Sequence, residues 1–277
     1  MTGAGPRTAL AVGPHLDDAV FSAGGTLRAL VAAGWRVRVV TCFTASVPDP
    51  TGFALSTQLD KGLGADIDYM ALRRAEDQEA QRRLGTRRPV HLPLPEAPHR
   101  GYHSPAALFG DPLPEDDLTH ALAAHLRPLL RDADLVLGPQ ALGAHVDHRL
   151  TTRALLAFGV LPRLALWRDA PYAVRCPDAR PDGTVRGTAA LTEVSVDVTG
   201  HLTAKVNAVL AYATQLGFQF GGEENVPGAV RAATRGDAVA AAGRARHAER
   251  LLAGGQAAAH LRALAYADRT SASRQGP

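Results

Sequence analysis

Hydrophobic and polar residues follow two alternating spacings along the first two-thirds of the chain. Short apolar runs, such as 8–13 and 36–43, have the length and composition of buried strands. Between them lie longer segments with apolar residues at helical spacing, such as 18–33 and 69–84, each closed by a glycine. Further strands are expected at 89–94, 135–138 and 163–167, and further helices at 115–131 and 149–158. This order predicts an α/β fold with a mostly parallel sheet and helices on both of its faces.

The pattern changes after Pro171. Polar and apolar residues alternate over 192–198, which is typical of a strand with one exposed face. A helix is expected over 203–216, and 229–265 consists mostly of helix-forming Ala, Arg, Glu and Leu interrupted by glycines. We therefore expect one domain over 1–268 that ends in a helical elaboration, followed by a disordered tail over 269–277.

Two clusters of histidine and aspartate carry the candidate chemistry. The first spans 15–18 and the second spans 145–148, and each directly follows a predicted strand. Active sites of open α/β sheets lie at the carboxyl ends of the strands, so the two clusters predict one composite metal site. The residues concerned are His15, Asp17 and Asp18 in the first cluster, and His145, Asp147 and His148 in the second.

The residue types suit a metal centre that activates water. One turn of chain can aim His15 and Asp18 at the same cation, and His148 can supply a distant third ligand. Such a set leaves positions open for water, whose pKa zinc lowers to about 7. Asp17 and Asp147 remain beside the site, so one could take a proton from the water and the other could orient a histidine. The alternative is structural: the aspartates could cap the following helix, and His148 could cap or pair locally.

Composition narrows the class of protein. The chain has 277 residues and a net charge of +3 from 30 basic and 27 acidic residues, a balance that gives no reason to expect a nucleic-acid partner. Cys42 and Cys176 form no disulfide framework and the N-terminus lacks the order of a signal peptide, so we expect a reduced, cytoplasmic protein. No apolar run approaches the roughly 20 residues that span a bilayer, so no stable membrane association is expected.

Two segments, one rich in glycine and one rich in proline, are candidate binding elements. The segment 24–26, Gly-Gly-Thr, falls inside a predicted helix, where glycine favours close packing over phosphate contact, and the sequence contains no dinucleotide or P-loop motif. The segment 95–114 contains five prolines and little periodicity, and loops of that length are often functional. Its Arg100, Tyr102 and His103 are candidate substrate contacts, with a solvated surface loop as the alternative.

These motifs resemble those of a known family. The segments 14–18, 24–26 and 145–148 look like the signature of the LmbE-like, or PIG-L, zinc-dependent N-deacetylases, and Arg73 and Glu76 look like the family's Arg-x-x-Glu helix. A helix late in the family's sequence is also similar to this chain, at Lys205, Tyr212 and Gln215. The resemblance implies a Rossmann-like three-layer α/β/α sandwich. It also implies removal of an N-acetyl group from a small-molecule N-acetylglucosamine conjugate.

The resemblance also implies roles for individual residues. One zinc ion per chain, or another divalent metal in its place, would be bound by His15, Asp18 and His148. Asp17 would be the general base, and His145 would stabilise the oxyanion or protonate the leaving amine. Asp147 would orient His145, and Arg73 would contact the sugar or its aglycone.

One position departs from the family pattern. In the mycothiol branch of the family a tyrosine precedes the His-x-Asp-His cluster, whereas Gly143 and Ala144 precede it here. Either His145 and the metal suffice for the oxyanion, or another group such as Tyr102 or His103 closes over the site.

Two other functions stay open at this point. One is a metal-dependent phosphoesterase, which usually holds two metals about 3.5–4 Å apart and needs more carboxylates than these clusters supply. The other is a sugar-binding protein whose catalytic site has degraded, which the intact set of histidines and aspartates argues against.

Overall fold

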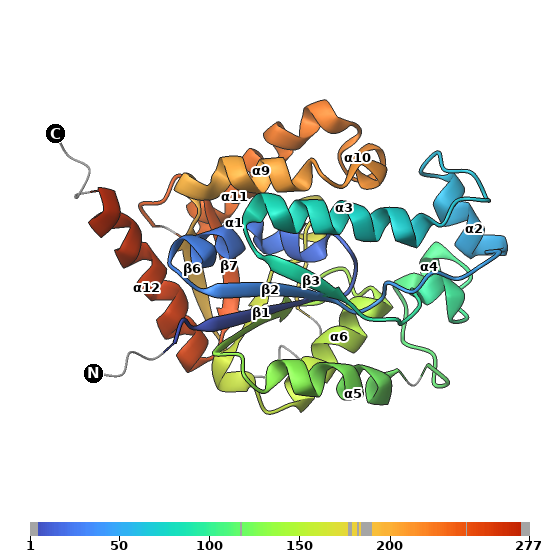
Figure 1. Ribbon diagram of the computed structural model, residues 1–277, viewed down its shortest axis with the longest axis horizontal. Coiled ribbons are helices and arrows are strands. Elements are labelled where there is room, and N and C mark those ends of the chain that lie inside the picture. Colours follow the sequence, from blue (N-terminus) through green and yellow to red (C-terminus); the bar gives the residue numbers. More distant parts are fainter. Residues whose placement is uncertain are drawn as a thin grey trace.

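The computed structural model describes residues 5–116, 118–176, 179–181, 183, 190–241 and 243–272 (Figure 1). They form a seven-stranded sheet in the order β3-β2-β1-β4-β5-β7-β6. The strands are β1 (Thr8–Gly13), β2 (Arg36–Thr41), β3 (Arg87–His91), β4 (Leu135–Pro139), β5 (Leu164–Trp167), β6 (Thr192–Asp197) and β7 (Ala248–Ala253). The first five strands of the chain are parallel, and β7 pairs antiparallel with both β5 and β6.

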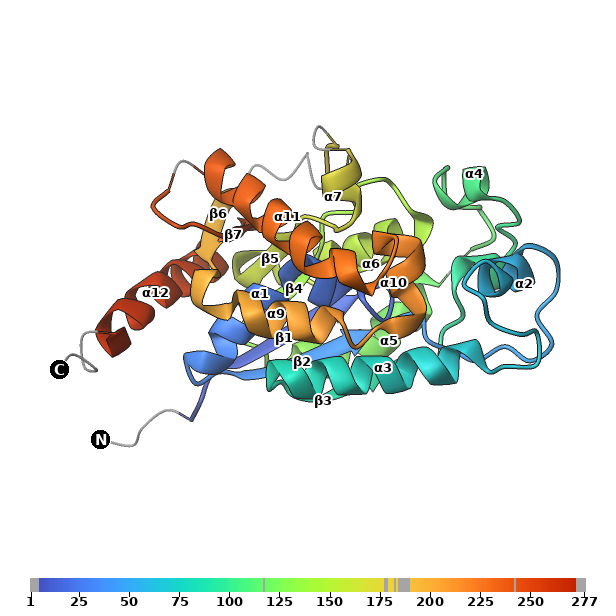
Figure 2. The same ribbon diagram turned by 90° about the horizontal axis from the view of Figure 1, so that it is seen from above.

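Helices cover both faces of this sheet (Figures 1 and 2). One apolar core joins the sheet to α1, α3 and α9, and another joins it to α5 and α6. The helices are α1 (Asp18–Ala32), α2 (Gly52–Leu59), α3 (Tyr69–Leu84), α4 (Pro105–Leu108), α5 (Thr119–Leu130), α6 (Val146–Ala157), α7 (Tyr172–Arg175), α9 (Leu202–Val209), α10 (Ala213–Phe220), α11 (Val226–Ala240) and α12 (Gly255–Ala272). The three-layer α/β/α sandwich with a mostly parallel sheet is confirmed. No helix in the described ranges is long and apolar enough to span a membrane.

The strand order explains how the two His/Asp clusters meet. From β1 the sheet grows outward through β2 to β3, and the chain then returns to the other side of β1 to form β4 and β5. The order therefore reverses between β1 and β4, and such reversals leave a crevice at the carboxyl ends of the strands. Because β1 ends at Gly13 and β4 ends at Pro139, segments 15–18 and 145–148 leave the sheet side by side.

The C-terminal part differs from the sequence prediction. The stretch 229–265, expected to be mostly helical, contains the strand β7 between α11 and α12. Its sequence, Ala-Glu-Arg-Leu-Leu-Ala, is made of helix formers, but burial between β5 and β6 overrides that preference. The helix expected over 203–216 is broken into α9 and α10, and Tyr212 between them donates its hydroxyl to Asp77 at 2.7 Å. Helix α12 extends to Ala272, and 273–277 of the expected tail lie outside the described residues.

The Gly-Gly-Thr segment has a packing role. Helix α1 is kinked at Ala23, which frees the next amides. The N–H groups of Gly25 and Thr26 donate to the carboxylate of Glu249 at 2.9 and 2.7 Å, and Lys205 pairs with that carboxylate at 2.6 Å. Close packing is thus the role of these glycines, as the sequence indicated.

Gly25→Ala is expected to destabilise the fold. An added Cβ would lie 2.7 Å from Val198 and 3.0 Å from Glu249. Overpacking of that kind costs about 1–3 kcal/mol, more than the gain of up to about 1 kcal/mol from replacing a helical glycine. Urea denaturation measures the change, with Gly228→Ala in α11 as a control because its Cβ would meet nothing within 4 Å. An equal or higher unfolding free energy for Gly25→Ala would contradict the assigned packing role.

Candidate active site

Three side chains from the two clusters converge on one point. His15 Nδ1 lies 3.3 Å from Asp18 Oδ2, and His148 Nε2 lies 3.3 Å from the same oxygen. One possible ligand atom of each residue lies within 4.8 Å of those of the other two. His15 and Asp18 come from the turn after β1, and His148 comes from the first turn of α6. The three residues could therefore hold one cation between them.

The hydrogen bonding of His148 supports a metal at this point. His148 Nδ1 lies 2.7 Å from Asp169 Oδ1, and Asp169 also accepts the N–H groups of Gln140 and Leu142. Within the described part of the chain, His148 Nε2 is buried and has no hydrogen-bond partner. A buried polar atom without a partner is costly, and a carboxylate on one ring nitrogen is the usual support of a metal-binding histidine on the other. Imidazole and carboxylate donors here fit a divalent transition metal.

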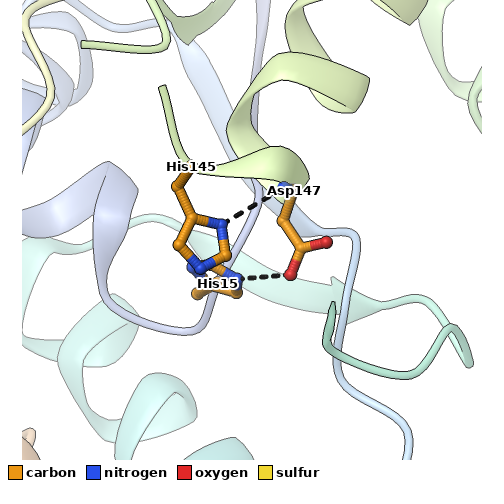
Figure 3. A group of neighbouring side chains, drawn as sticks. All are labelled: His15, His145 and Asp147. Carbon is orange, nitrogen blue, oxygen red and sulfur yellow. Dashed lines mark hydrogen bonds and ion pairs between the residues drawn. The ribbon is translucent and has the colours of Figure 1, made fainter. Parts of the chain in front are cut away.

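Figure 3 shows that His15 is supported in the same way. His15 Nε2 lies 2.9 Å from Asp147 Oδ2, which leaves Nδ1 to face Asp18. His145 caps α6, and its Nδ1 accepts the backbone N–H of Asp147 at 3.2 Å. The Asp147 carboxylate therefore orients His15. The hydrogen bond between Asp147 and His145 comes from the backbone N–H of Asp147 and not from its carboxylate, unlike the role that the resemblance implied.

A second, overlapping group is less suited to a metal. His15, His145 and Asp147 also offer atoms within 4.8 Å of one another. Both oxygens of Asp147 are already occupied, since they accept hydrogen bonds from His15, Arg100 and the N–H of Ala97. The group around the unpartnered His148 nitrogen is the better metal site.

The two adjacent aspartates have opposite electrostatic environments. Burial raises the pKa of Asp17 to about 6, even though Arg73 lowers it. Burial would raise the pKa of Asp18 too, but the charge of His148 and the hydrogen bond from His15 outweigh it and lower the pKa to about 2. Neighbouring carboxylates with separated pKa values are typical of sites in which one group binds and the other transfers a proton.

The side chain of Asp17 does not cap helix α1. The residue stands at the N-cap position of α1, but its side chain makes no capping hydrogen bond. Its Oδ2 lies 3.5 Å from Arg73 Nη2 and faces a cavity, so the structural alternative for this residue is wrong. Asp18 does bond locally, accepting the N–H of His15 at 2.8 Å, which fixes the turn that aims both residues.

His145 is a neutral hydrogen-bond donor in this environment. Burial lowers its pKa to about 3. Because its Nδ1 accepts the amide of Asp147, the proton of the neutral ring sits on Nε2. The Nε2–H group can therefore donate to a ligand in the cavity that His145 lines.

A cavity of about 290 Å³ opens over this group of residues. That is near the lower end of the range for small-molecule sites, about 300–1,000 Å³. Its lining contains Arg73, which pairs with Glu96 at 2.6 Å, and every His and Asp of the two clusters except His148. Aromatic residues with apolar neighbours form much of its wall: Phe53, Leu108, Phe109, Tyr172 and Phe218. Arg73, one of the expected substrate contacts, therefore lies in the wall of this cavity.

The other three expected substrate contacts lie elsewhere. Arg100 is buried against Asp116 and Asp147, and Tyr102 is fully buried with its hydroxyl donating to Asp116. His103 is exposed, and none of these three side chains lines the cavity. The loop does reach the site, but through Leu108 and Phe109. Polar residues of the loop are used to fold it, which sequence spacing alone does not reveal.

Two residues near the site were not recognised in the sequence. Asp169 stands two residues after the end of β5, so its position near the carboxyl end of a strand is a signal that could have identified it. Tyr172 begins α7 and packs its ring against Gly143, where an added Cβ would lie 2.8 Å away. Its ring also lies 5.6 Å from that of His148, so a tyrosine approaches the site from another segment than the family pattern suggests.

The doubly wound sheet places a candidate metal centre at its switch point, which is where open α/β sheets carry their active sites. The model of the PIG-L family, described as GlcNAc-PI de-N-acetylase, matches residues 10–158, more than half of the chain. The chain belongs to this family, as its motifs indicated, and is an N-deacetylase.

Relatives from bacteria agree with this membership. The chain is 34% identical over 211 residues to a 2'-N-acetylparomamine deacetylase of Streptomyces fradiae, covering 74% of this chain and 72% of the relative. It is 28% identical over 242 residues to the enzyme of that name from Niallia circulans, covering 78% of this chain and 84% of the relative.

Solved structures of deacetylases superpose on this chain. The A40926 pseudoaglycone deacetylase superposes with a TM-score of 0.72 at 29% identity, covering 88% of this chain and 96% of that one. A zinc-inhibited form of teicoplanin deacetylase superposes with a TM-score of 0.74 at 26% identity, covering 88% and 97%.

Proposed function

We propose that this protein removes the N-acetyl group of an N-acetylated amino sugar within a small-molecule conjugate, with one zinc ion in its site. The observation that carries the proposal is His148 Nε2, a buried atom without a hydrogen bond that lies 3.3 Å from Asp18 Oδ2. Asp18 lines the cavity together with His15 and Asp17. The relatives include a 2'-N-acetylparomamine deacetylase and an A40926 pseudoaglycone deacetylase.

The proposed metal ligands are His15 Nδ1, Asp18 Oδ2 and His148 Nε2. When bound there, zinc would lower the pKa of a water molecule and polarise the acetyl carbonyl. Asp147 and Asp169 hold the two histidines by their other nitrogens, so that the lone pairs face the cation.

The other side chains of the site transfer protons or stabilise negative charge. Asp17 takes a proton from the attacking water and later returns it to the departing amine. Of the aspartates in the two clusters, Asp18 and Asp147 are paired with histidines, whereas Asp17 lines the cavity beside Arg73. The Nε2–H of His145 and the hydroxyl of Tyr172 face the negative charge that develops on the carbonyl oxygen. Aromatic rings of the wall, such as Phe109, suit contact with the face of a sugar.

The test is release of acetate from N-acetylglucosaminyl conjugates by protein stripped of metal and then supplied with zinc. Zinc-dependent acetate release supports the proposal. A protein that binds zinc and releases no acetate from any of these conjugates would contradict it, and would restore the sugar-binding alternative.

A two-metal phosphoesterase is not favoured by the arrangement of ligands. Within the described ranges, the two candidate ligand groups both use His15, so they cannot be filled together with three protein ligands each. Metal analysis that finds two ions per chain in the active protein would reopen that alternative.

Tyr172→Phe is expected to lower kcat by about 10²-fold with zinc affinity unchanged, since removing one donor to an oxyanion typically costs about 10²–10³. Tyr102→Phe is the matched control, because that hydroxyl is bonded to Asp116 away from the cavity. Steady-state kinetics together with zinc titration measure both effects. Equal kcat values for the two variants would remove Tyr172 from the oxyanion site.

A further inference from the structure

Arg100 is a buried cation outside the cavity with every side-chain nitrogen engaged. Its Nε and Nη2 donate to Asp116 at 3.1 and 2.9 Å, and its Nη1 donates to the carbonyl of Pro95 at 2.7 Å. Its guanidinium also lies over the ring of Phe43, 4.8 Å from the ring centre. Nη2 has a further partner, Asp147 Oδ1 at 2.7 Å.

Asp147 connects this cation to the candidate metal site. While Oδ1 accepts from Arg100, Oδ2 accepts from His15 Nε2 at 2.9 Å and from the N–H of Ala97 at 3.1 Å. Its side chain is completely buried, and a buried carboxylate is stable only when charge and hydrogen bonds compensate it. Arg100 supplies that charge through one bond to Oδ1, and its own position is fixed because its rigid fork of donors is bound to Asp116.

The second histidine of the site is supported differently. Asp169, which holds His148, receives its other hydrogen bonds from the backbone amides of Gln140 and Leu142. The two supporting carboxylates therefore differ: one is fixed by neutral amides at the ends of the sheet, and the other by a charged side chain from the proline-rich loop.

We propose that Arg100 is a positioning residue that sets the metal affinity of the site through Asp147 and His15. This inference rests on the metal ligands of the proposed function. It gives the loop 95–114 a role in metal binding through Arg100, in addition to the cavity wall formed by Leu108 and Phe109. Metal affinity depends on groups that orient the ligands, whose loss typically costs about 10–100-fold.

The test is the dissociation constant of zinc, measured by competition with a chromophoric chelator on the full-length protein. Arg100→Gln is expected to weaken zinc binding by about 10-fold, and Arg100→Lys, which keeps the charge but not the fork, by less. Tyr102→Phe is the control: it removes a hydrogen bond to Asp116 in the same loop, touches neither Asp147 nor His15, and should bind zinc like the parent. Cobalt substitution adds a visible spectrum that reports ligand geometry, which should change in Arg100→Gln and not in Tyr102→Phe.

A double-mutant cycle separates positioning from loop folding. In an Asp147→Asn background, Arg100→Gln should cause no further loss of zinc affinity, because the bond through which it acts is already weakened. The inference would be overturned if Arg100→Gln and Arg100→Lys bound zinc as tightly as the parent does. It would also be overturned if Tyr102→Phe lost as much zinc affinity as Arg100→Gln. Absence of acetate release from a parent protein that binds zinc would contradict the proposed function and leave this inference standing. A parent that binds no zinc would overturn both.

Discussion

Asp17→Asn is expected to lower kcat by about 10²–10⁴-fold, the usual contribution of a general base, while zinc binding is retained. The carboxylate lines the cavity and makes no capping bond to α1, so its loss removes a proton acceptor without opening the helix. Its pKa in the folded, metal-free protein is about 6, above the ordinary value of 3.8. A carboxyl group whose pKa is raised by folding disfavours the folded state once it ionises, so at pH 7 the neutral asparagine should leave the unfolding free energy of metal-free protein unchanged or higher.

Asp68 is the matched control for that experiment. It is an N-cap whose carboxylate accepts the N–H of Ala71 at 2.9 Å, at the start of α3. Asp68→Ala should lower the unfolding free energy by about 1 kcal/mol, as loss of an N-cap does, and should leave kcat near that of the parent. If Asp17→Asn instead lost stability and kept its kcat, Asp17 would be a structural residue and the base would have to be sought elsewhere.

His148→Ala is expected to abolish zinc binding at micromolar protein and to lower deacetylation by about 10³-fold, equivalent to about 4 kcal/mol of transition-state stabilisation. The physical reason is that Nε2 of this residue is buried, makes no hydrogen bond and lies 3.3 Å from Asp18 Oδ2, so it is placed to bind the cation together with that carboxylate. Isothermal titration with zinc and an acetate assay measure the two effects. His103→Ala, at an exposed histidine away from the cavity, should behave as the parent does. Full zinc occupancy in His148→Ala would show that the ligands are other residues.

Local sequence predicted those parts of the fold whose pattern and surroundings agree. Helix α3 runs over the expected 69–84, capped by Asp68 and ended by Gly85 in the left-handed conformation. Strand β7 was missed because its residues are helix formers and only its neighbours in the sheet make it a strand. Helix α6 starts at Val146, ahead of the expected 149, because His145 acts as an N-cap, a role usually taken by Ser, Thr, Asp or Asn.

In the site, as in the fold, local sequence predicts the positions of segments but not the contacts made by residues distant in sequence. The two clusters were placed correctly at strand ends, since parallel strands bring such segments to one edge. Whether a polar residue faces the cavity or a neighbouring segment depends on long-range packing. Arg100 and Tyr102 therefore could not be separated from substrate contacts by sequence, and Tyr172, five residues past the end of β5, gave no signal that it approaches His148.

Glu249 is synthesised long after Gly25 and Thr26, whose backbone amides it binds. It is separated from Gly25 by 224 positions and from Thr26 by 223. At a synthesis rate of about 5–20 residues per second, the nascent chain waits about 11–45 s between the two. During that time α1, which begins with Asp18, has no carboxylate for the amides exposed at its kink. The bonds that complete the helix next to the first His/Asp cluster thus form only after Glu249 has been synthesised, so this helix is expected to reach its final packing late in folding.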